Sequence, residues 1–134
     1  MTTKILIADD SRFIHRVFEG MFERYALHVC ELVHAHDGQQ ALSALAQQPD
    51  VDLILLDINM PVMNGLEFLE EWGRSSFYAD IPVVVVSTSS FEDGVQKGLA
   101  AGARDYVVKP FEVDALFDIV SRHVPGLERR PEGT

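Results

Sequence analysis

The stretch Val51-Asp52-Leu53-Ile54-Leu55-Leu56-Asp57 is an apolar run that ends in a carboxylate, and it has counterparts elsewhere in the chain. Three further short apolar runs end in charged or hydroxyl side chains: Lys4-Ile5-Leu6-Ile7-Ala8 before Asp9-Asp10, Val83 to Val86 before Ser87-Thr88-Ser89-Ser90, and Tyr106-Val107-Val108 before Lys109-Pro110. Runs of this length and apolarity are typical of strands that are covered on both faces of a parallel sheet.

The segments between these runs carry apolar residues at helical spacing, and Ser11 and Asp37-Gly38 suit an N-cap and a turn. The pattern predicts strands at 4–8, 28–35, 51–56, 81–86 and 104–108, and helices at 13–25, 39–48, 66–72, 91–101 and 111–124. Five β-α units with short connections predict an α/β fold, with a doubly wound five-stranded parallel sheet and five helices.

Composition restricts the kinds of partner that this chain can have. It has 134 residues, 11 of them basic and 21 acidic, and a formal net charge of −10. This acidity argues against nucleic-acid binding, which needs a positive surface, and favours a basic partner. The single cysteine, Cys30, excludes an internal disulfide and is compatible with the reducing cytoplasm. The sequence contains neither a signal peptide nor an apolar stretch long enough for a membrane span.

The polar C-terminal segment is set apart from the rest of the chain. Residues 1–124 contain all the predicted elements, whereas 125–134 carry two prolines and two glycines. We therefore predict one domain at 1–124, followed by a frayed tail or the stump of a linker. A stand-alone protein is the direct interpretation, and a longer regulator with a domain beyond the linker is the alternative.

The strand ends bring chemistry-bearing side chains to one edge of the predicted sheet, where open α/β sheets bind ligands. Asp9, Asp10 and Asp57 would meet there, and two carboxylates about 4 Å apart repel by roughly 1 to 4 kcal/mol. A hard cation such as Mg²⁺, which prefers oxygen ligands, relieves that repulsion. An aspartate can also attack phosphorus, while Lys109 neutralises charge and the Ser87 hydroxyl donates a hydrogen bond.

Each of these features also has an ordinary structural explanation. The Asp9-Asp10 pair can cap a helix, Lys109-Pro110 can end a strand, and the hydroxyl residues after 86 can form a loop and an N-cap. Their occurrence after successive strands, in this order, favours a common site over independent coincidences.

Together these residues resemble the receiver domain of bacterial two-component response regulators. The resemblance covers about residues 4–124, and its motifs are Asp9-Asp10-Ser11, Asp57-Ile58-Asn59-Met60-Pro61-Val62-Met63-Asn64-Gly65, Val83 to Ser87, Gly102-Ala103 and Tyr106-Val107-Val108-Lys109-Pro110-Phe111. It implies a flavodoxin-like sheet with the strand order 2-1-3-4-5, which a chemotaxis receiver shares.

The resemblance implies roles for the charged residues in a phosphorelay. Asp57 would accept a phosphoryl group from a sensor histidine kinase or a histidine phosphotransfer protein. Asp10, Asp57 and the backbone carbonyl of Asn59 would ligate Mg²⁺, and Asp9 would help to hold the metal, partly through water. Lys109 would pair with the phosphoryl group.

The resemblance also implies a switch. Ser87 would move toward the phosphoryl group, and Tyr106 would change between outward and inward rotamers. The surface of the predicted segments 91–101, 104–108 and 111–124 would then be remodelled for a downstream protein target, an effector domain or a second copy of the chain. Such a cytoplasmic module has only its own phosphotransfer and autodephosphorylation, so it is a signalling phosphoprotein and not an enzyme with a metabolic substrate.

Three positions would tune the chemistry in the family. Asn59 and Ser89 lie two residues beyond Asp57 and Ser87, where the family adjusts hydrolysis. Thr88 stands where the family usually has alanine or another very small residue. Its extra bulk would narrow access to Asp57, which affects donor preference and the lifetime of the phosphoryl group.

Three alternatives remain open at this stage. A Mg²⁺-dependent aspartyl-phosphate phosphohydrolase needs a second acid two residues after its nucleophile, where this chain has Asn59. A flavin or nucleotide binder needs a loop rich in glycine or hydroxyl residues after the first strand, where this chain has Asp9-Asp10. A receiver-like scaffold that works without phosphorylation is expected to lose Asp57, Lys109 or the acid pair.

The histidines and the glycines carry no part of this chemistry. The histidines are scattered, and we interpret them as structural or solvated, because His34 and His36 share a strand face and a zinc site needs further ligands; the others are His15, His28 and His123. Gly94, Gly98 and Gly102 recur every four residues, and each interior glycine costs a helix about 0.8 to 1 kcal/mol relative to alanine. We hypothesise that the helix at 91–101 is locally weak and shifts on phosphorylation.

Overall fold

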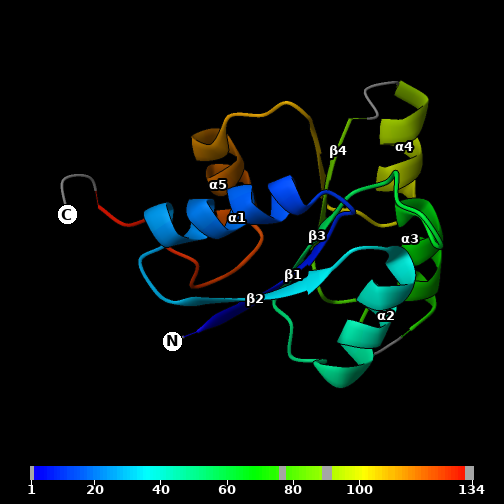
Figure 1. Cartoon of the computed structure of the whole chain (residues 1–134), viewed down its shortest axis with the longest axis horizontal. Helices are drawn as coiled ribbons and strands as arrows, with labels where there is room; N and C mark the ends of the chain where they lie inside the picture. The colour runs from blue at the N-terminus through cyan, green and yellow to red at the C-terminus, as the bar shows by residue number, and fades with distance from the viewer. Residues whose placement is uncertain (1, 76–77, 89–91, 132–134) are drawn as a thin grey trace.

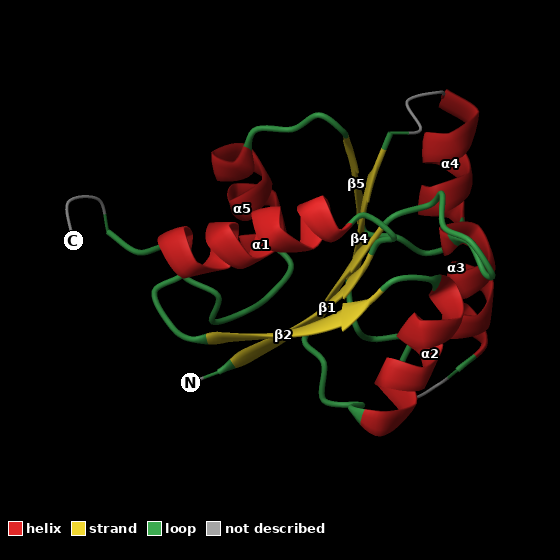
Figure 2. Ribbon diagram, viewed as in Figure 1, coloured by secondary structure: helices red, strands yellow, loops and turns green. Residues whose placement is uncertain are grey.

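The sheet is the central layer of the molecule (Figure 2). The computed structural model describes residues 2–75, 78–88 and 92–131, and places the strands β1 (Thr3–Ala8), β2 (Cys30–Ala35), β3 (Leu53–Leu56), β4 (Val83–Ser87) and β5 (Asp105–Val108). In these ranges the five strands lie in the order β2-β1-β3-β4-β5, and every neighbouring pair is parallel. The predicted fold class and strand order are confirmed.

Helices cover both faces of the sheet. In the described residues they are α1 (Arg12–Tyr25), α2 (Gly38–Gln47), α3 (Gly65–Arg74), α4 (Glu92–Ala100) and α5 (Val113–Ser121). Figure 1 shows α1 and α5 on one face and α2, α3 and α4 on the other. Helix α5 is shorter than predicted at both ends, and Phe91, the predicted start of α4, lies outside the described residues. No described helix is both long enough and apolar enough to cross a bilayer.

Two apolar cores form because successive strand residues point to opposite faces of the sheet. On one face, Leu6, Ile54 and Val85 are buried with the apolar residues of α2 and α3, among them Phe68 and Trp72. On the other face, the strand residues Ile7, Leu55 and Val84 share a core with Phe18 of α1 and Phe117 of α5. This double coverage explains why the central strands are almost wholly apolar.

Side-chain caps fix where the helices next to the carboxyl ends of the strands begin. Ser11 accepts from the amide of Ile14 at the start of α1, and Asp37 caps α2, so Gly38 is a helical residue and not part of a free turn. Asn64 and Glu67 form a reciprocal capping box at the start of α3. The loop between β3 and α3 is thereby held at both of its ends.

The described part of the C-terminal segment, residues 125–131, is packed against the domain. Leu127 is buried in the core beneath α1 and α5, and the amide of Leu27 donates to the carbonyl of Glu128 at 2.9 Å. The guanidinium of Arg129 contacts Asp118 on α5 at 2.8 Å and lies over the ring of Tyr25. The expectation of a frayed tail is therefore wrong for these residues, whereas the domain boundary at residue 124 stays a prediction.

Candidate functional site

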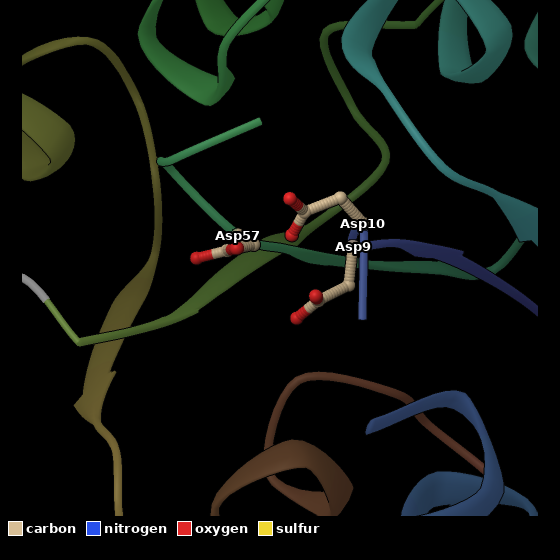
Figure 3. A group of neighbouring side chains, drawn as sticks. All are labelled: Asp9, Asp10 and Asp57. Carbon is tan, nitrogen blue, oxygen red and sulfur yellow. The ribbon is translucent and has the colours of Figure 1, made fainter. Parts of the chain in front are cut away.

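Three carboxyl groups gather where β1 and β3 end (Figure 3). One oxygen from each of Asp9, Asp10 and Asp57 lies within 4.8 Å of the others. Asp9 and Asp57 are buried, whereas Asp10 is exposed. The predicted convergence of these side chains is thus present, and it follows from the parallel pairing of β1 with β3.

Asp57 is held from the backbone on both sides. Its amide donates to the carbonyl of Ala8 at 2.9 Å, and its Oδ1 accepts from the amide of Ile58 at 2.9 Å. Burial, and secondly the charge of Asp9, raise the pKa of the Asp57 carboxyl, against the opposing effects of Lys109 and of a hydrogen bond from Ser87. The ionised carboxylate is therefore under-compensated, which favours the arrival of a cation.

Lys109 reaches two of the carboxylates from the end of β5. Its Nζ lies 2.7 Å from Oδ2 of Asp9 and 3.9 Å from Oδ2 of Asp57, and the Lys109-Pro110 peptide bond is cis. The other oxygen of Asp9 accepts from the amide of Ser11 at 2.8 Å. The ammonium thus pairs most closely with Asp9, a preference that the sequence did not reveal.

The remaining predicted site residues lie at different depths. Ser87 is fully buried at the end of β4 and hydrogen-bonds to Asp57, while Thr88 and Asn59 are exposed. Tyr106 is half-buried on β5 and packs against the core under α4, away from the carboxylates. Ser89, predicted to tune hydrolysis, lies outside the described residues.

The loop after β3 packs closely against the backbone of Asp57. A Cβ at Gly65 would lie 2.3 Å from the carbonyl oxygen of Asp57, and the amide of Gly65 donates to the carbonyl of Ile58 at 2.8 Å. Val62, at the tip of the loop, has a φ of 68° although it is β-branched. The loop therefore leaves no room for a side chain at position 65, and it holds its tip in a conformation that costs a valine energy.

An apolar groove borders the site between α1 and the segment after β5. It has a volume of about 450 Å³, and its lining includes Phe13, Val17, Thr88, Lys109 and Phe111. Phe13 is 71% exposed. Because Lys109 contributes to both, the groove is continuous with the acid site.

Sequence reasoning missed the role of His15. This buried side chain on α1 places Nε2 2.7 Å from the carbonyl oxygen of Asp9, and burial lowers the pKa of its imidazole. Its ring also lies next to the rings of His34 and His36, so the view of the histidines as scattered is wrong for these three. The available signal was helical periodicity, which puts position 15 on the same face as Phe18 and Phe22.

This combination of strand order and site defines a class of protein. A doubly wound parallel sheet with an acid cluster, a lysine and a buried hydroxyl at its carboxyl edge is the architecture of a CheY-like receiver domain.

The chain belongs to the response regulator receiver domain family, whose model matches residues 5–121. A chemotaxis protein CheY homolog of Campylobacter jejuni subsp. jejuni serotype O:23/36 (strain 81-176) is 34% identical over 113 residues, which are 84% of this chain and 85% of that protein. The resemblance seen in the sequence is confirmed, and the chain is a receiver of the kind that works in two-component signalling.

Solved structures support the same assignment. The chemotaxis protein CheY4 of Vibrio cholerae is 31% identical, with a TM-score of 0.82, and the match covers 92% of this chain and all of that one at 100%. The Mn²⁺-bound form of the response regulator Rcp1 is 29% identical, with a TM-score of 0.79 over 96% of this chain and 99% of that one.

Proposed function

We propose that this chain is a phosphoacceptor in a two-component phosphorelay, in which Asp57 takes a phosphoryl group from a sensor histidine kinase or a histidine phosphotransfer protein. The observation that carries this proposal is the convergence of Asp9, Asp10 and Lys109 on the buried carboxylate of Asp57.

The transfer is a displacement at phosphorus. A carboxylate oxygen of Asp57 attacks, the bond from phosphorus to the donor nitrogen breaks, and its electron pair leaves with the imidazole of the donor. Lys109 then exchanges its contact with Asp9 for the new phosphoryl oxygens, which its present position between Asp9 and Asp57 allows. The buried hydroxyl of Ser87 donates to another of these oxygens.

The acid cluster fits a hard divalent cation. Its ligands are all oxygen atoms, and Asp9, Asp10, Asp57 and the carbonyl of Asn59 would hold Mg²⁺. When bound, the ion neutralises the charge that builds up on the transferred group. Two features of the chain support this fit: the raised pKa of Asp57 and the resemblance to Rcp1, a protein described in a Mn²⁺-bound form.

The response is transmitted to the β5 edge of the sheet. We assign the switch to Ser87 and Tyr106, because Ser87 touches Asp57 and ends the strand that pairs with β5. Inward movement of Tyr106 changes the surface of α4, β5 and α5, where Leu99 and Val108 are exposed and available to a downstream protein target or effector domain. Asn59, Thr88 and Ser89 tune hydrolysis and access.

The phosphodonor protein is placed on the apolar groove. Phe13 is exposed there beside Lys109, so a donor domain seated on it brings its phosphohistidine to the acid site. Phe13→Ala is expected to slow transfer from a histidine phosphotransfer protein at least about tenfold, equivalent to about 1.4 kcal/mol. Its reaction with acetyl phosphate is expected to be unchanged, because this small donor needs no groove. An equal loss with both donors would contradict this placement.

The decisive experiment for the acceptor is an intact-mass measurement. Wild-type protein incubated with Mg²⁺ and acetyl phosphate is expected to gain one phosphoryl group, and Asp57→Asn none. The exposed Asp80→Asn is the matched control and is expected to behave like the wild type. The proposal is wrong if the wild type stays unmodified or if Asp57→Asn is modified equally. Fast repeated turnover of a phosphate ester would indicate a phosphohydrolase instead.

A further inference from the structure

Three imidazole rings and a carboxylate lie together on the outer side of β1, between α1 and β2. His15 and Glu19 lie on α1 and His34 lies on β2. His36 lies in the short connection between β2 and α2. The ring centroid of His15 lies 4.8 Å from that of His34 and 4.6 Å from that of His36. These side chains line a surface pocket of about 350 Å³.

The hydrogen bond of His15 and the ion-pair contact of His34 indicate which ring nitrogens carry hydrogen. Nε2 of His15 lies 2.7 Å from the carbonyl oxygen of Asp9, and Nε2 of His34 lies 3.3 Å from a carboxylate oxygen of Glu19. Both oxygens can only accept, so both Nε2 atoms are the donors. The nitrogen with a free lone pair in each neutral ring is therefore Nδ1.

These two Nδ1 atoms face one another at 2.6 Å. Two lone pairs at that distance repel, so the position between them requires a positive centre. One proton, shared as a hydrogen bond, fills this position. A metal ion satisfies the same requirement after displacing that proton to solvent.

The outer partners of these two rings are of the kind that metal-ligating histidines have. Such a histidine usually binds the ion through one nitrogen and donates its other N–H to a carboxylate or a backbone carbonyl. His15 makes the hydrogen bond to the backbone carbonyl of Asp9, and His34 has the carboxylate of Glu19 as an ion-pair neighbour at 3.3 Å. Binding needs the two Nδ1 atoms to separate from 2.6 Å to about 3.3 Å, the spacing set by zinc–nitrogen distances of about 2.0 to 2.1 Å.

We propose that His15, His34 and His36 form a second cation site, which takes a divalent transition-metal ion of the Zn²⁺ class. His15 and His34 would supply Nδ1 ligands and water the remaining position, and His36 would have to turn from its place beside the His15 ring to bring a third nitrogen to the ion. Imidazole ligands select zinc, nickel or copper over Mg²⁺, whereas the all-oxygen acid cluster has the opposite preference. The exposed Arg12 and Arg16 oppose a cation here, and Glu19 offsets part of their charge.

An ion at this position would lie close to the acid cluster. His15 holds the carbonyl of Asp9, so the new site is one hydrogen bond away from the acid cluster. The proposal does not depend on phosphorylation, because the histidine site is built from different residues.

The test is calorimetric titration of ZnCl₂ into the full chain with Mg²⁺ in large excess. The wild type is expected to bind one equivalent of Zn²⁺, and His34→Asn is expected to bind more than about tenfold more weakly. The matched control is His28→Asn, the same change at an exposed histidine outside the cluster, which is expected to leave binding unchanged. Asp57→Asn is also expected to retain the site.

Two further measurements distinguish loss of the metal site from loss of the fold. The His34 side chain is 33% exposed, so its replacement is expected to leave the far-ultraviolet circular dichroism unchanged, unlike a change at the buried His15. In NMR spectra, Zn²⁺ is expected to shift the ring signals of His15 and His34 together. The proposal is overturned if the wild type binds no Zn²⁺ in excess Mg²⁺, if His34→Asn and His28→Asn bind it equally, or if Asp57→Asn abolishes binding.

Discussion

The centre of the sheet and its β5 edge are covered to very different degrees. All four residues of β3 are buried, and the neighbouring β1 is buried except for Lys4. In β5, by contrast, three residues are half-buried and Val108 is exposed. The acidic residues directly follow the two covered strands, whereas Tyr106 lies within the open one.

This difference suits the two tasks that we propose for the chain, phosphotransfer and switching. Phosphotransfer needs carboxylates held in fixed positions, and strands packed on both faces provide that support. A switch needs an element that can move at low cost, and elements with little buried apolar contact are the ones that open most easily. Substitutions in the two regions test this difference.

Truncation of a central residue is expected to cost far more than truncation at the edge. Leu55 on β3 is 1% exposed, and Leu55→Ala is expected to lower the free energy of unfolding by about 2 to 5 kcal/mol. Val108→Ala on β5 is expected to change it by less than about 0.5 kcal/mol, because this side chain is already partly hydrated. Urea unfolding of both variants measures the contrast, and similar losses would show that the edge is as tightly packed as the centre.

The charge of Asp57 is expected to oppose folding when no metal is present. Its pKa is raised above the ordinary 3.8, so the folded chain holds a proton that the unfolded chain has released, and stability falls as the pH rises through this window. Asp57→Asn removes the effect and is expected to raise the unfolding midpoint at neutral pH, by less than Leu55→Ala lowers it.

Thermal unfolding in a chelating buffer at several pH values checks this expectation. The advantage of Asp57→Asn is expected to shrink as the pH falls and to vanish below the ordinary pKa of 3.8, where the wild-type carboxyl becomes protonated in both states. Added Mg²⁺ is expected to stabilise the wild type more than the variant. An unchanged or lower midpoint for Asp57→Asn at neutral pH would mean that Lys109 and Ser87 already compensate the charge.

The centre of the molecule was predictable from sequence because its physics is local and repetitive. Apolar runs such as 53–56 fit only strands covered on both faces, and parallel pairing then brings Asp9 and Asp57 to one edge. The pairing of Lys109 with Asp9 was not predictable. It depends on the difference between 2.7 Å to Asp9 and 3.9 Å to Asp57, and no sequence pattern encodes so small a difference.

The contacts that sequence reasoning missed join segments that carry no shared pattern. The contact of His15 with His34 depends on how α1 is rotated about its axis where it packs against β2. It also depends on the register of β2 against β1, which places His34 opposite Ile7. The packed tail was hidden by its polar composition, since its position depends on one apolar residue, Leu127, and on the contacts of Arg129.

The substitution Gly98→Ala tests whether the Tyr106 side chain is the mobile part of the β5 edge. The added Cβ would lie 3.3 Å from Cδ2 and Cε2 of the Tyr106 ring, so the ring has to give way outward. Alanine otherwise favours a helix over glycine by about 0.8 to 1 kcal/mol. Gly98→Ala is therefore expected to gain less stability than this.

The matched control is Gly20→Ala on α1, where no atom lies within 4 Å of the new Cβ. This variant is expected to gain the full helix preference of about 0.8 to 1 kcal/mol. NMR signals of the Tyr106 ring are expected to move in Gly98→Ala and to stay in place in Gly20→Ala. Equal stabilisation with an unmoved ring would show that the edge accommodates the methyl group elsewhere.

The loop after β3 is the strained part of the otherwise well-supported centre, and relieving it is expected to give the smallest effect. Val62 is 82% exposed at a φ of 68°, so Val62→Gly removes an unfavourable conformation without losing buried contacts. The variant is expected to be more stable by about 0.5 to 1 kcal/mol, after the larger entropy of glycine in the unfolded chain is subtracted. Val29→Gly is the control, because Val29 is 72% exposed without a positive φ, and it is expected to lose stability instead. If both variants lose stability in urea unfolding, the loop stores no strain, and support for the acid site extends unbroken from β3 to α3.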